Sequence, residues 1–485
     1  MINAIQRKWW ILVVVTLVAF ITNVDATIVI VGLPRLMLGL HITITTGLWT
    51  LTAYIITSTV FLLPAGRWSD VVGRKRIFMI GLSIFTVATV LCGFAPSGAL
   101  LITFRFIQGV GAALALATAT PIIVHAFPKH QLGRALGINS TAWVIGSIVG
   151  PVAGGVLVTT LGWRWIFFVT VPFALAGMVA AWFVLEESAA KKSLGTTDWP
   201  GIASFGMALV LLLIGLSEGQ AWGFGSLRIL SLFAGTAVLL IGFVVRELRT
   251  VDPLFDLKLL LNRHYRAGLG VTVSYSIGYF ATTFLLTIYL QGALHLSPLK
   301  AGLLLIPLSL PQLVISPLGG WLADRFGPPR FIILGVILLA VGGYLLGQLG
   351  PTLQLSAVIV PLLLMSVATG LAWPALTKVV MSSAPLTRTG AASGMFFTFR
   401  NVGMSLSLTL ALVVAETSLP SAIAAKAFLG TAGVLLPHFR DILTHSTDAG
   451  FRVFVIFYGV ALLFSLFLLR PIVPASTAVP QKEKA

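Results

Sequence analysis

Residues 66–78 read GRWSDVVGRKRIF, a stretch that places one acid and four bases between two long apolar segments. A related stretch, GWLADRFGPPRF, occupies residues 320–331, 254 positions later. Each stretch follows the second apolar segment of its half of the chain. Four positions coincide: Gly66 with Gly320, Asp70 with Asp324, Gly73 with Gly327, and Arg76 with Arg330. The chain therefore reads as a duplication that carries a charged loop at the same place in each half.

The composition is that of a chain embedded in a lipid bilayer. Of its 485 residues, 58% are hydrophobic and only 9% are charged, whereas soluble domains carry about 25% charged residues. So few charges cannot cover a surface that faces water, which predicts a polytopic membrane protein. In a soluble protein the net charge of +17 would suggest a nucleic-acid partner. Here we assign it to cytoplasmic loops and expect no nucleic acid to bind.

Fourteen apolar segments are long enough to cross a bilayer as helices, each of which needs about 20 residues. Because lipid offers no partners to backbone polar groups, the predicted fold is an all-α membrane protein. If the N-terminus is placed on the cytoplasmic side, 22 of the 31 Lys and Arg residues fall on that side and 7 on the outer side. This bias predicts a multi-pass protein of the cell (inner) membrane with both termini cytoplasmic. The segments lie at 9–31, 46–65, 77–95, 99–121, 135–160, 165–185, 199–216, 228–246, 267–290, 299–318, 331–349, 354–377, 390–415 and 452–470.

The repeat and the helix count together predict an arrangement of 6 + 2 + 6 helices. Residues 1–190 form the first six-helix bundle, 191–250 two inserted helices, and 251–475 the second bundle, related to the first by a pseudo-twofold axis. The second bundle includes a long external loop at 416–451. Residues 476–485 form a cytoplasmic tail.

Three further stretches of sequence form a set of motifs with the charged loop at 66–78. LITFRFIQGVGAA lies at 101–113, GSIVGPVAGG at 146–155 and NVDATIVIVGLP at 23–34. Together with the loop at 66–78, they resemble motifs of the major facilitator superfamily and of its fourteen-helix drug:proton antiporter family. The resemblance covers the whole chain and implies the major facilitator fold, in which duplicated halves hold a substrate between them.

The resemblance also implies roles for individual residues. The loop residues form a conformational latch in which Asp70 joins the halves on the cytoplasmic side, against a helix that begins near Thr389. The alternative for the bases is a purely topological role. Pro328 and Pro329 replace the basic pair in the second copy, which predicts a weaker latch. The latch set is Gly66, Asp70, Gly73, Arg74, Lys75, Asp324 and Arg330, and the antiporter motif is Gly146, Gly150, Pro151, Gly154 and Gly155.

Two buried charges suggest how transport is powered. Asp25 and Arg105 each lie six residues from the outer end of their spans, about 9 Å deep, and intramembrane charges mark function by default. A carboxylate that leaves a cationic partner takes up a proton more readily, so breaking and remaking this pair would couple transport to protons. The alternative is a static ion pair that only fixes helix packing.

The substrate cavity is predicted from polar and aromatic residues within the spans. For Arg400 three roles stay open: binding an anionic substrate group, pairing with an acid, or capping backbone carbonyls. Most of the aromatic residues have core packing or a place in the interfacial belt as their alternative. The predicted lining is Gln108, Asn139, Trp143, Tyr275, Tyr279, Thr282, Phe396 and Arg400.

The predicted function is proton-coupled antiport that exports small amphiphilic or drug-like molecules, as in multidrug efflux and antibiotic resistance. Neither a GxxxxGK[ST] nor an HExxH motif occurs, so we expect no enzyme activity, no metal and no cofactor, with the proton gradient as the energy source. Alternatives are a lipid or amphiphile exporter, a proton symporter, or a receptor or channel. Asp25 is the only deep carboxylate, which disfavours dicationic substrates. We expect a monomer with a small-molecule substrate and protons as partners.

Overall fold

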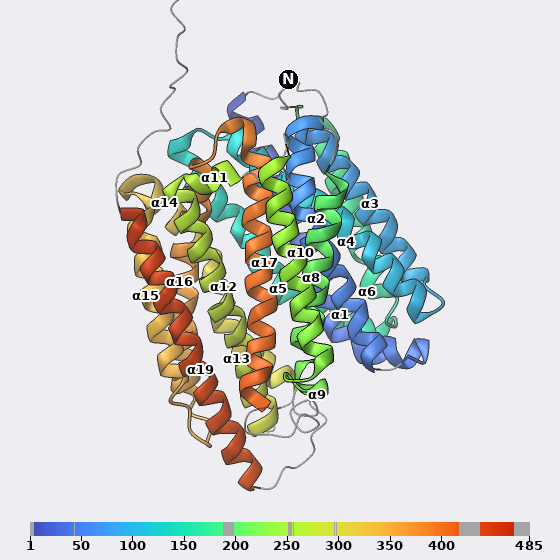
Figure 1. Cartoon of the computed structure of the whole chain (residues 1–485), viewed down its shortest axis with the longest axis vertical. Coiled ribbons are helices and arrows are strands. Elements are labelled where there is room, and N and C mark those ends of the chain that lie inside the picture. The colour runs from blue at the N-terminus through green and yellow to red at the C-terminus, as the bar shows by residue number, and fades with distance from the viewer. Residues whose placement is uncertain are drawn as a thin grey trace, which may run out of the picture.

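A computed structural model shows how the helices are arranged (Figure 1). Within the part of the chain that it describes, no β-strand is present, and thirteen helices are long and apolar enough to cross a membrane. The chain is therefore a multi-pass, all-α membrane protein. The described residues are 4–42, 44–187, 198–250, 255, 257–294, 296, 298–416 and 437–469.

The first half consists of six spans, the last of which is divided into two helices. In chain order they are α1 (Ala4–Leu40), α2 (Ile44–Val72), α3 (Arg74–Phe94), α4 (Gly98–Ala126), α5 (Lys129–Thr160), and α6 (Trp165–Phe168) with α7 (Thr170–Val184).

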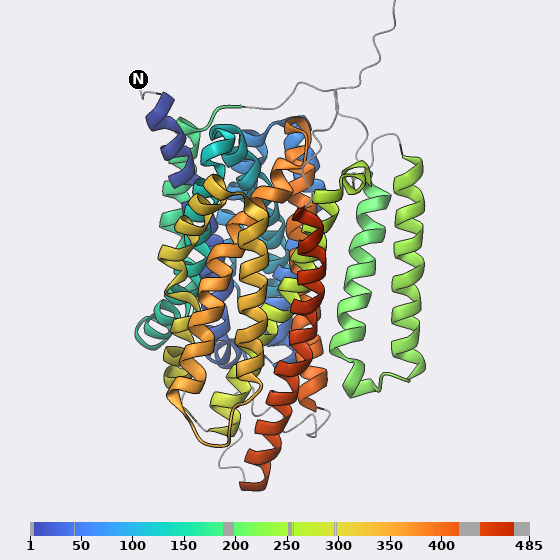
Figure 2. The ribbon, with the colours of Figure 1, turned by 90° about the vertical axis from the view of Figure 1, so that its left-hand side faces the viewer.

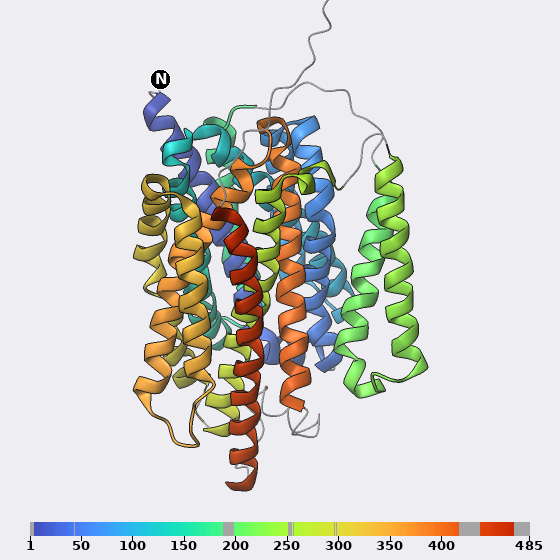
Figure 3. The same ribbon diagram turned by 60° about the vertical axis from the view of Figure 1, so that its left-hand side comes forward.

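Two helices between the halves stand to one side of the main bundle, as two views agree (Figures 2 and 3). They are α8 (Trp199–Ser217) and α10 (Leu227–Arg249), joined through the short α9 (Gly219–Trp222). α10 packs on α8, which in turn contacts α2 and α17. Asp198, which caps the start of α8, pairs with Arg246 near the end of α10 at 2.7 Å.

The second half begins with the short α11 (Leu257–Leu261). One of its spans is interrupted between α13 and α14 at Leu310 and Pro311, and a short π-helix, η1, follows α12. The remaining elements are α12 (Arg263–Thr287), η1 (Ile288–Ala293), α13 (Pro298–Ser309), α14 (Gln312–Phe326), α15 (Pro328–Leu346), α16 (Leu355–Ser382), η2 (Leu386–Arg388), α17 (Thr389–Glu416), α19 (Pro437–Leu466) and η3 (Phe467–Leu469).

Helices at equivalent places in the two halves form the contact between them. α2 packs on α17, and α14 packs on α5. α2 and α14 are the second spans of their halves, whereas α5 and α17 are the fifth. Each contact therefore joins the second span of one half to the fifth span of the other, as a pseudo-twofold axis requires.

The last helix departs from the sequence-based prediction. Residues 416–451 were expected to form an external loop, but α19 begins at Pro437, so its first fifteen residues were assigned wrongly to the loop. Thr444, Thr447 and Asp448 in this stretch are buried, and the Thr447 hydroxyl donates to the carbonyl of Leu443 one turn earlier. These polar side chains lower the hydropathy of a segment that tertiary packing nevertheless buries. Residues 417–436 lie outside the described part of the chain.

α17 is the predicted span at 390–415, yet it is not one of the thirteen helices that meet the apolarity requirement. It is 28 residues long and carries Arg400 and Asn401 in its middle. A total of fourteen spans thus stays a prediction that depends on this helix.

Candidate functional site

A buried ion pair lies where α1 and α4 meet. Nη1 of Arg105 lies 2.7 Å from Oδ2 of Asp25, and the exposed fractions are 1% for the arginine and 0% for the aspartate. Nε2 of Gln108 donates to the other carboxylate oxygen at 2.9 Å, and Oε1 of Gln108 accepts from Nη1 of Arg105 at 2.6 Å. The side-chain amide of Gln108 therefore contacts both charged groups of the ion pair.

Two further helices complete the surroundings of the pair. The backbone carbonyl of Thr50 in α2 accepts from Nε of Arg105 at 3.1 Å, and the hydroxyl of Thr89 in α3 contacts Nε2 of Gln108 at 2.6 Å. The guanidinium also lies over the ring of Tyr54, 4.4 Å from its centroid. A buried pair is stable only when the remaining donors and acceptors are satisfied, and here four helices supply the partners.

Gln108 was predicted to line the substrate cavity, and this role stays a prediction. Its exposed fraction is 0%, because Asp25, Arg105 and Thr89 occupy its polar atoms. In this conformation Gln108 belongs to the ion-pair network.

The first charged loop joins α2 of one half to α17 of the other. The carboxylate of Asp70 accepts from the backbone amides of Gly390 and Ala391, at 3.0 and 2.9 Å. Nη2 of Arg74 lies 3.0 Å from the same carboxylate and also donates to the carbonyl of Leu386 and the hydroxyl of Thr389. An acid at a helix N-terminus satisfies orphan amides and complements the helix dipole.

The second charged loop repeats this contact with the halves exchanged. The carboxylate of Asp324, in α14, accepts from the amides of Gly133 and Arg134 in α5, both at 2.9 Å. Nζ of Lys378 lies 2.7 Å from Asp324. The second loop was expected to form the weaker latch because it lacks the basic pair. In the structure α16 supplies the missing cation, and the carboxylate makes as many amide contacts as its counterpart.

Both contacts depend on glycine pairs at the helix crossings. Gly66 lies against the backbone of Gly390, and Gly320 lies against the backbone of Gly133. A Cβ on any of the four would collide with the opposing main chain. Small residues at such crossings let helices approach closely, and this approach brings each carboxylate within reach of its amides.

The remaining loop residues act within one half. Gly73 and Gly327 adopt φ of 124° and 90°, which L side chains rarely adopt, and they turn the chain into the next helix. Nζ of Lys75 donates to the carbonyl of Trp182 at 2.7 Å. Glu187, which no sequence motif marks, accepts from the amides of Lys75 and Arg76 at the start of α3. Arg330 is exposed at the start of α15.

The fifth-helix motif packs α5 on α1. Thr27 donates to the carbonyl of Gly146 at 3.2 Å, and a Cβ on Gly150 would collide with the Thr27 side chain. Gly154 is buried, and Pro151 lies within the helix. Gly155 faces open space, since a Cβ added there would have nothing within 4 Å. Close packing therefore explains part of the motif but not Gly155.

Arg400 contacts aromatic rings of both halves. Its guanidinium carbon lies 5.1, 5.2 and 5.7 Å from the ring centroids of Trp143, Phe280 and Trp373. Trp143 belongs to the first half, and the other two rings belong to the second. The neighbouring Asn401 donates to the hydroxyl of Thr59 in α2 at 3.2 Å.

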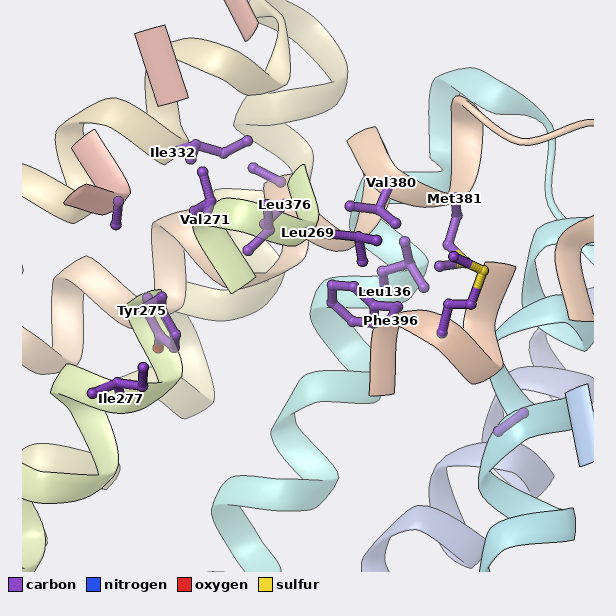
Figure 4. Close-up of a cluster of buried hydrophobic side chains, with 14 of the residues drawn as sticks. Leu136, Leu269, Val271, Tyr275, Ile277, Ile332, Leu376, Val380, Met381 and Phe396 are labelled. Carbon is purple, nitrogen blue, oxygen red and sulfur yellow. The ribbon is translucent and has the colours of Figure 1, made fainter. Parts of the chain in front are cut away.

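The other predicted cavity residues divide into two groups. Tyr279 and Asn139 are partly exposed; Tyr279 stacks on Tyr275 at 5.6 Å, and Asn139 accepts from Thr16 at 3.3 Å. Tyr275, Thr282 and Phe396 are buried, and Figure 4 shows Tyr275 and Phe396 among buried apolar side chains. In this conformation these three residues are buried, and their assignment to the cavity lining stays a prediction.

The fold and these cross-contacts define a transporter built from two related halves. The sequence pattern of the Major Facilitator Superfamily matches residues 15–408 and 272–485. The chain belongs to the Major Facilitator Superfamily.

Among the relatives are an antibiotic resistance and export protein and a multidrug resistance protein. The tetracenomycin C resistance and export protein of Streptomyces glaucescens is 30% identical over 400 residues, which cover 82% of this chain and 74% of the relative. The multidrug resistance protein Stp of Mycobacterium tuberculosis (strain CDC 1551 / Oshkosh) is 31% identical, and the match covers 81% of this chain and 73% of the relative.

A solved structure shows the same fold. The proton:xylose symporter XylE is 17% identical with a TM-score of 0.64, and the likeness covers 96% of each chain. These relatives and neighbours are transporters and not enzymes, and the chain accordingly takes a small molecule across a membrane.

Proposed function

We propose that this protein is a proton-coupled antiporter that exports small amphiphilic or drug-like molecules from the cytoplasm. The observation that carries the proposal is the closed network of Asp25, Arg105 and Gln108. It places a carboxylate and a guanidinium, both buried, at the junction of two helices of one half. Burying an ion pair within the membrane costs desolvation energy. The presence of such a pair therefore points to a role in the transport cycle.

The network suggests how a proton is carried. Nη1 of Arg105 lies 2.7 Å from the carboxylate of Asp25, so the two side chains form an ion pair between α4 and α1. A movement of α4 relative to α1 would separate the charges and promote proton uptake. Return of the pair would release the proton on the other side of the membrane.

The closed latches support alternating access as the way in which substrate crosses. Asp70 and Asp324 lie at one end of the bundle, here called the latch end, and each joins the two halves. The bias of Lys and Arg residues assigns the latch end to the cytoplasm. Opening of both contacts would expose the interface between the halves to that side. A monomer in the bacterial cell membrane, with both termini cytoplasmic, suffices for this cycle.

The test is transport by proteoliposomes that contain the purified protein. A panel of anionic, neutral and cationic aromatic compounds is offered with and without an imposed pH gradient, and a protonophore serves as the control. The proposal predicts that compound moves against the proton gradient and that the protonophore abolishes its accumulation. Equal rates with and without the gradient would reject proton coupling, and movement in the same direction as protons would favour a symporter.

A further inference from the structure

Arg400 is an intramembrane cation for which the proton-coupling mechanism has no use. It lies in the middle of α17, and its guanidinium donates one hydrogen bond in the described part of the chain, to Oδ1 of the adjacent Asn401 at 3.3 Å. A guanidinium has five N–H donors. A charge held within a membrane protein with most of its donors unused marks a functional site by default.

No described acid neutralises Arg400. Asp25, Asp70 and Asp324 are engaged with Arg105, Arg74 and Lys378. Glu186, Glu187 and Asp198 pair with Arg7, Arg76 and Arg246. Glu416, on the same helix, lies sixteen residues further along, about 24 Å away at 1.5 Å per residue. A structural ion pair, one of the three roles open from sequence, is therefore not what the described residues form.

The surroundings of Arg400 are aromatic and come from both halves. Trp143 of α5, Phe280 of α12 and Trp373 of α16 each lie within 6 Å of the guanidinium carbon. Two ring contacts continue this surface: Trp373 lies 5.6 Å from Tyr275 in a tilted arrangement, and Tyr275 stacks on Tyr279. The ring faces hold the cation in place while its planar edge keeps its donors for another acceptor.

We propose that Arg400 and these rings form a binding site for planar aromatic anions, molecules that carry one carboxylate or phenolate on a fused or conjugated ring system. The guanidinium binds the anionic oxygens through paired N–H donors, and Trp143 and Trp373 stack on the ring system. This inference rests on the proposed function, since it names the substrate class of the same transporter. A cationic substrate would meet the Arg400 charge with no described acid beside it.

Because the rings belong to both halves, an occupied site bridges them. Asn401 next to Arg400 already contacts Thr59 of the first half. A ligand held between Trp143 and Trp373 therefore contacts two bodies that separate during the cycle, which is what a transported molecule must do.

The experiment is equilibrium binding to purified protein in nanodiscs, with no gradient present. The probes share one ring system and differ in charge: 2-naphthoate, 2-naphthamide and 2-naphthylmethylammonium. We expect naphthoate to bind at least about tenfold more tightly than the amide, because charge-assisted bonds are roughly twice as strong as neutral ones. Arg400→Gln should abolish this preference by weakening naphthoate binding far more than naphthamide binding, and Arg400→Lys should retain part of it.

Two controls keep the test decisive. Arg228→Gln removes an exposed arginine at the start of α10 and should leave all three affinities unchanged. Trp373→Leu should weaken naphthoate and naphthamide alike, since both stack on the ring. Equal affinity of Arg400→Gln and wild type for naphthoate, or no preference of wild type for naphthoate over the amide, would overturn the inference. Either result leaves proton coupling untouched, because that is measured separately as gradient-driven transport.

Discussion

The loops at 66–78 and 320–331 make the same bridge between the halves but obtain their cations differently. In both loops, a carboxylate accepts hydrogen bonds from two backbone amides near the start of a helix in the other half. Arg74 belongs to the loop itself and reaches across to Leu386 and Thr389. Lys378 comes from α16 of the same half as Asp324 and donates to Ala323 and Asp324.

The comparison separates the parts that the two bridges share from the part that differs between them. Each bridge has an acid, a pair of amides and a glycine crossing, whereas the cation comes from different helices. Arg74 is part of the bridge, because it bonds to both halves. Lys378 neutralises and orients Asp324 within one half. Loss of the basic pair from the second loop therefore does not leave its acid unpaired.

The largest expected effect comes from removing both carboxylate charges. Each amide hydrogen bond to a charged group contributes about 1.5–3 kcal/mol, so the double variant Asp70→Asn, Asp324→Asn should shift the protein strongly toward a form open at the latch end. Spin labels at Arg76→Cys and Arg330→Cys, both exposed and in opposite halves, report the separation by pulsed electron resonance. Cys92 is buried and does not compete for the label.

The two single variants sharpen the comparison. Since both acids make two amide contacts, Asp70→Asn and Asp324→Asn should each give a partial shift of similar size. A shift in the Asp70 variant with none in the Asp324 variant would show that the second loop is the weaker latch after all. Asp441→Asn, an exposed acid in α19, is the matched control and should change nothing.

A smaller effect is expected at the glycine crossings. Gly66→Ala and Gly320→Ala each place a Cβ against opposing backbone, and overpacking of this kind costs about 1–3 kcal/mol. Both variants should lengthen the same spin-label distance and slow transport several-fold. Gly302→Ala, where nothing lies within 4 Å of the added atom, controls for the substitution itself. Unchanged distances in both crossing variants would contradict the proposed close approach.

How far the sequence predicts this site depends on the kind of contact. Asp70 and Asp324 were found because their loops repeat, and local sequence carries that signal. The receiving segments repeat as well: residues 128–137 and 385–394 share Pro-x4-Gly-x-Ala-x-Gly, a pattern that would have located Gly133 and Gly390. Lys378 carries no such signal, because only the packing of α16 on α14 brings it to Asp324.

The helical fold was predictable because apolar segments of about 20 residues have few alternatives in lipid. The start of α19 was not, since buried Thr444, Thr447 and Asp448 look like loop residues by hydropathy. The contacts of Gln108 were not predictable for a related reason. Its position among intramembrane residues predicts burial, but its bonds to Asp25 and Arg105 follow from the packing of α4 on α1.

The cations themselves give the next test of the comparison. Arg74→Met removes the ion pair and two bonds to the other half, so it should open the latch end measurably. Lys378→Met removes contacts within one half only and should have an effect several-fold smaller on the population of the open form. Equal shifts in the two variants would mean that the cations have the same role.

The smallest effect is expected within the fifth-helix motif. Gly155→Ala meets open space and should alter transport by less than about twofold, whereas Gly150→Ala collides with Thr27 and should reduce transport and thermal stability together. Initial transport rates and melting temperatures of the two variants give the comparison. A severe loss in Gly155→Ala at wild-type stability would assign that glycine a role other than packing.

The central claim, that Asp25 carries the coupled proton, is tested most directly by comparing net transport with exchange. Asp25→Asn keeps the shape of the side chain and an oxygen for Arg105 but cannot bind and release a proton. In proteoliposomes we predict that this variant loses transport driven by a pH gradient and retains exchange of labelled for unlabelled substrate at equal pH, whereas Asp441→Asn retains both. Gradient-driven transport at the wild-type rate in Asp25→Asn would contradict the claim and leave the pair with Arg105 a structural one.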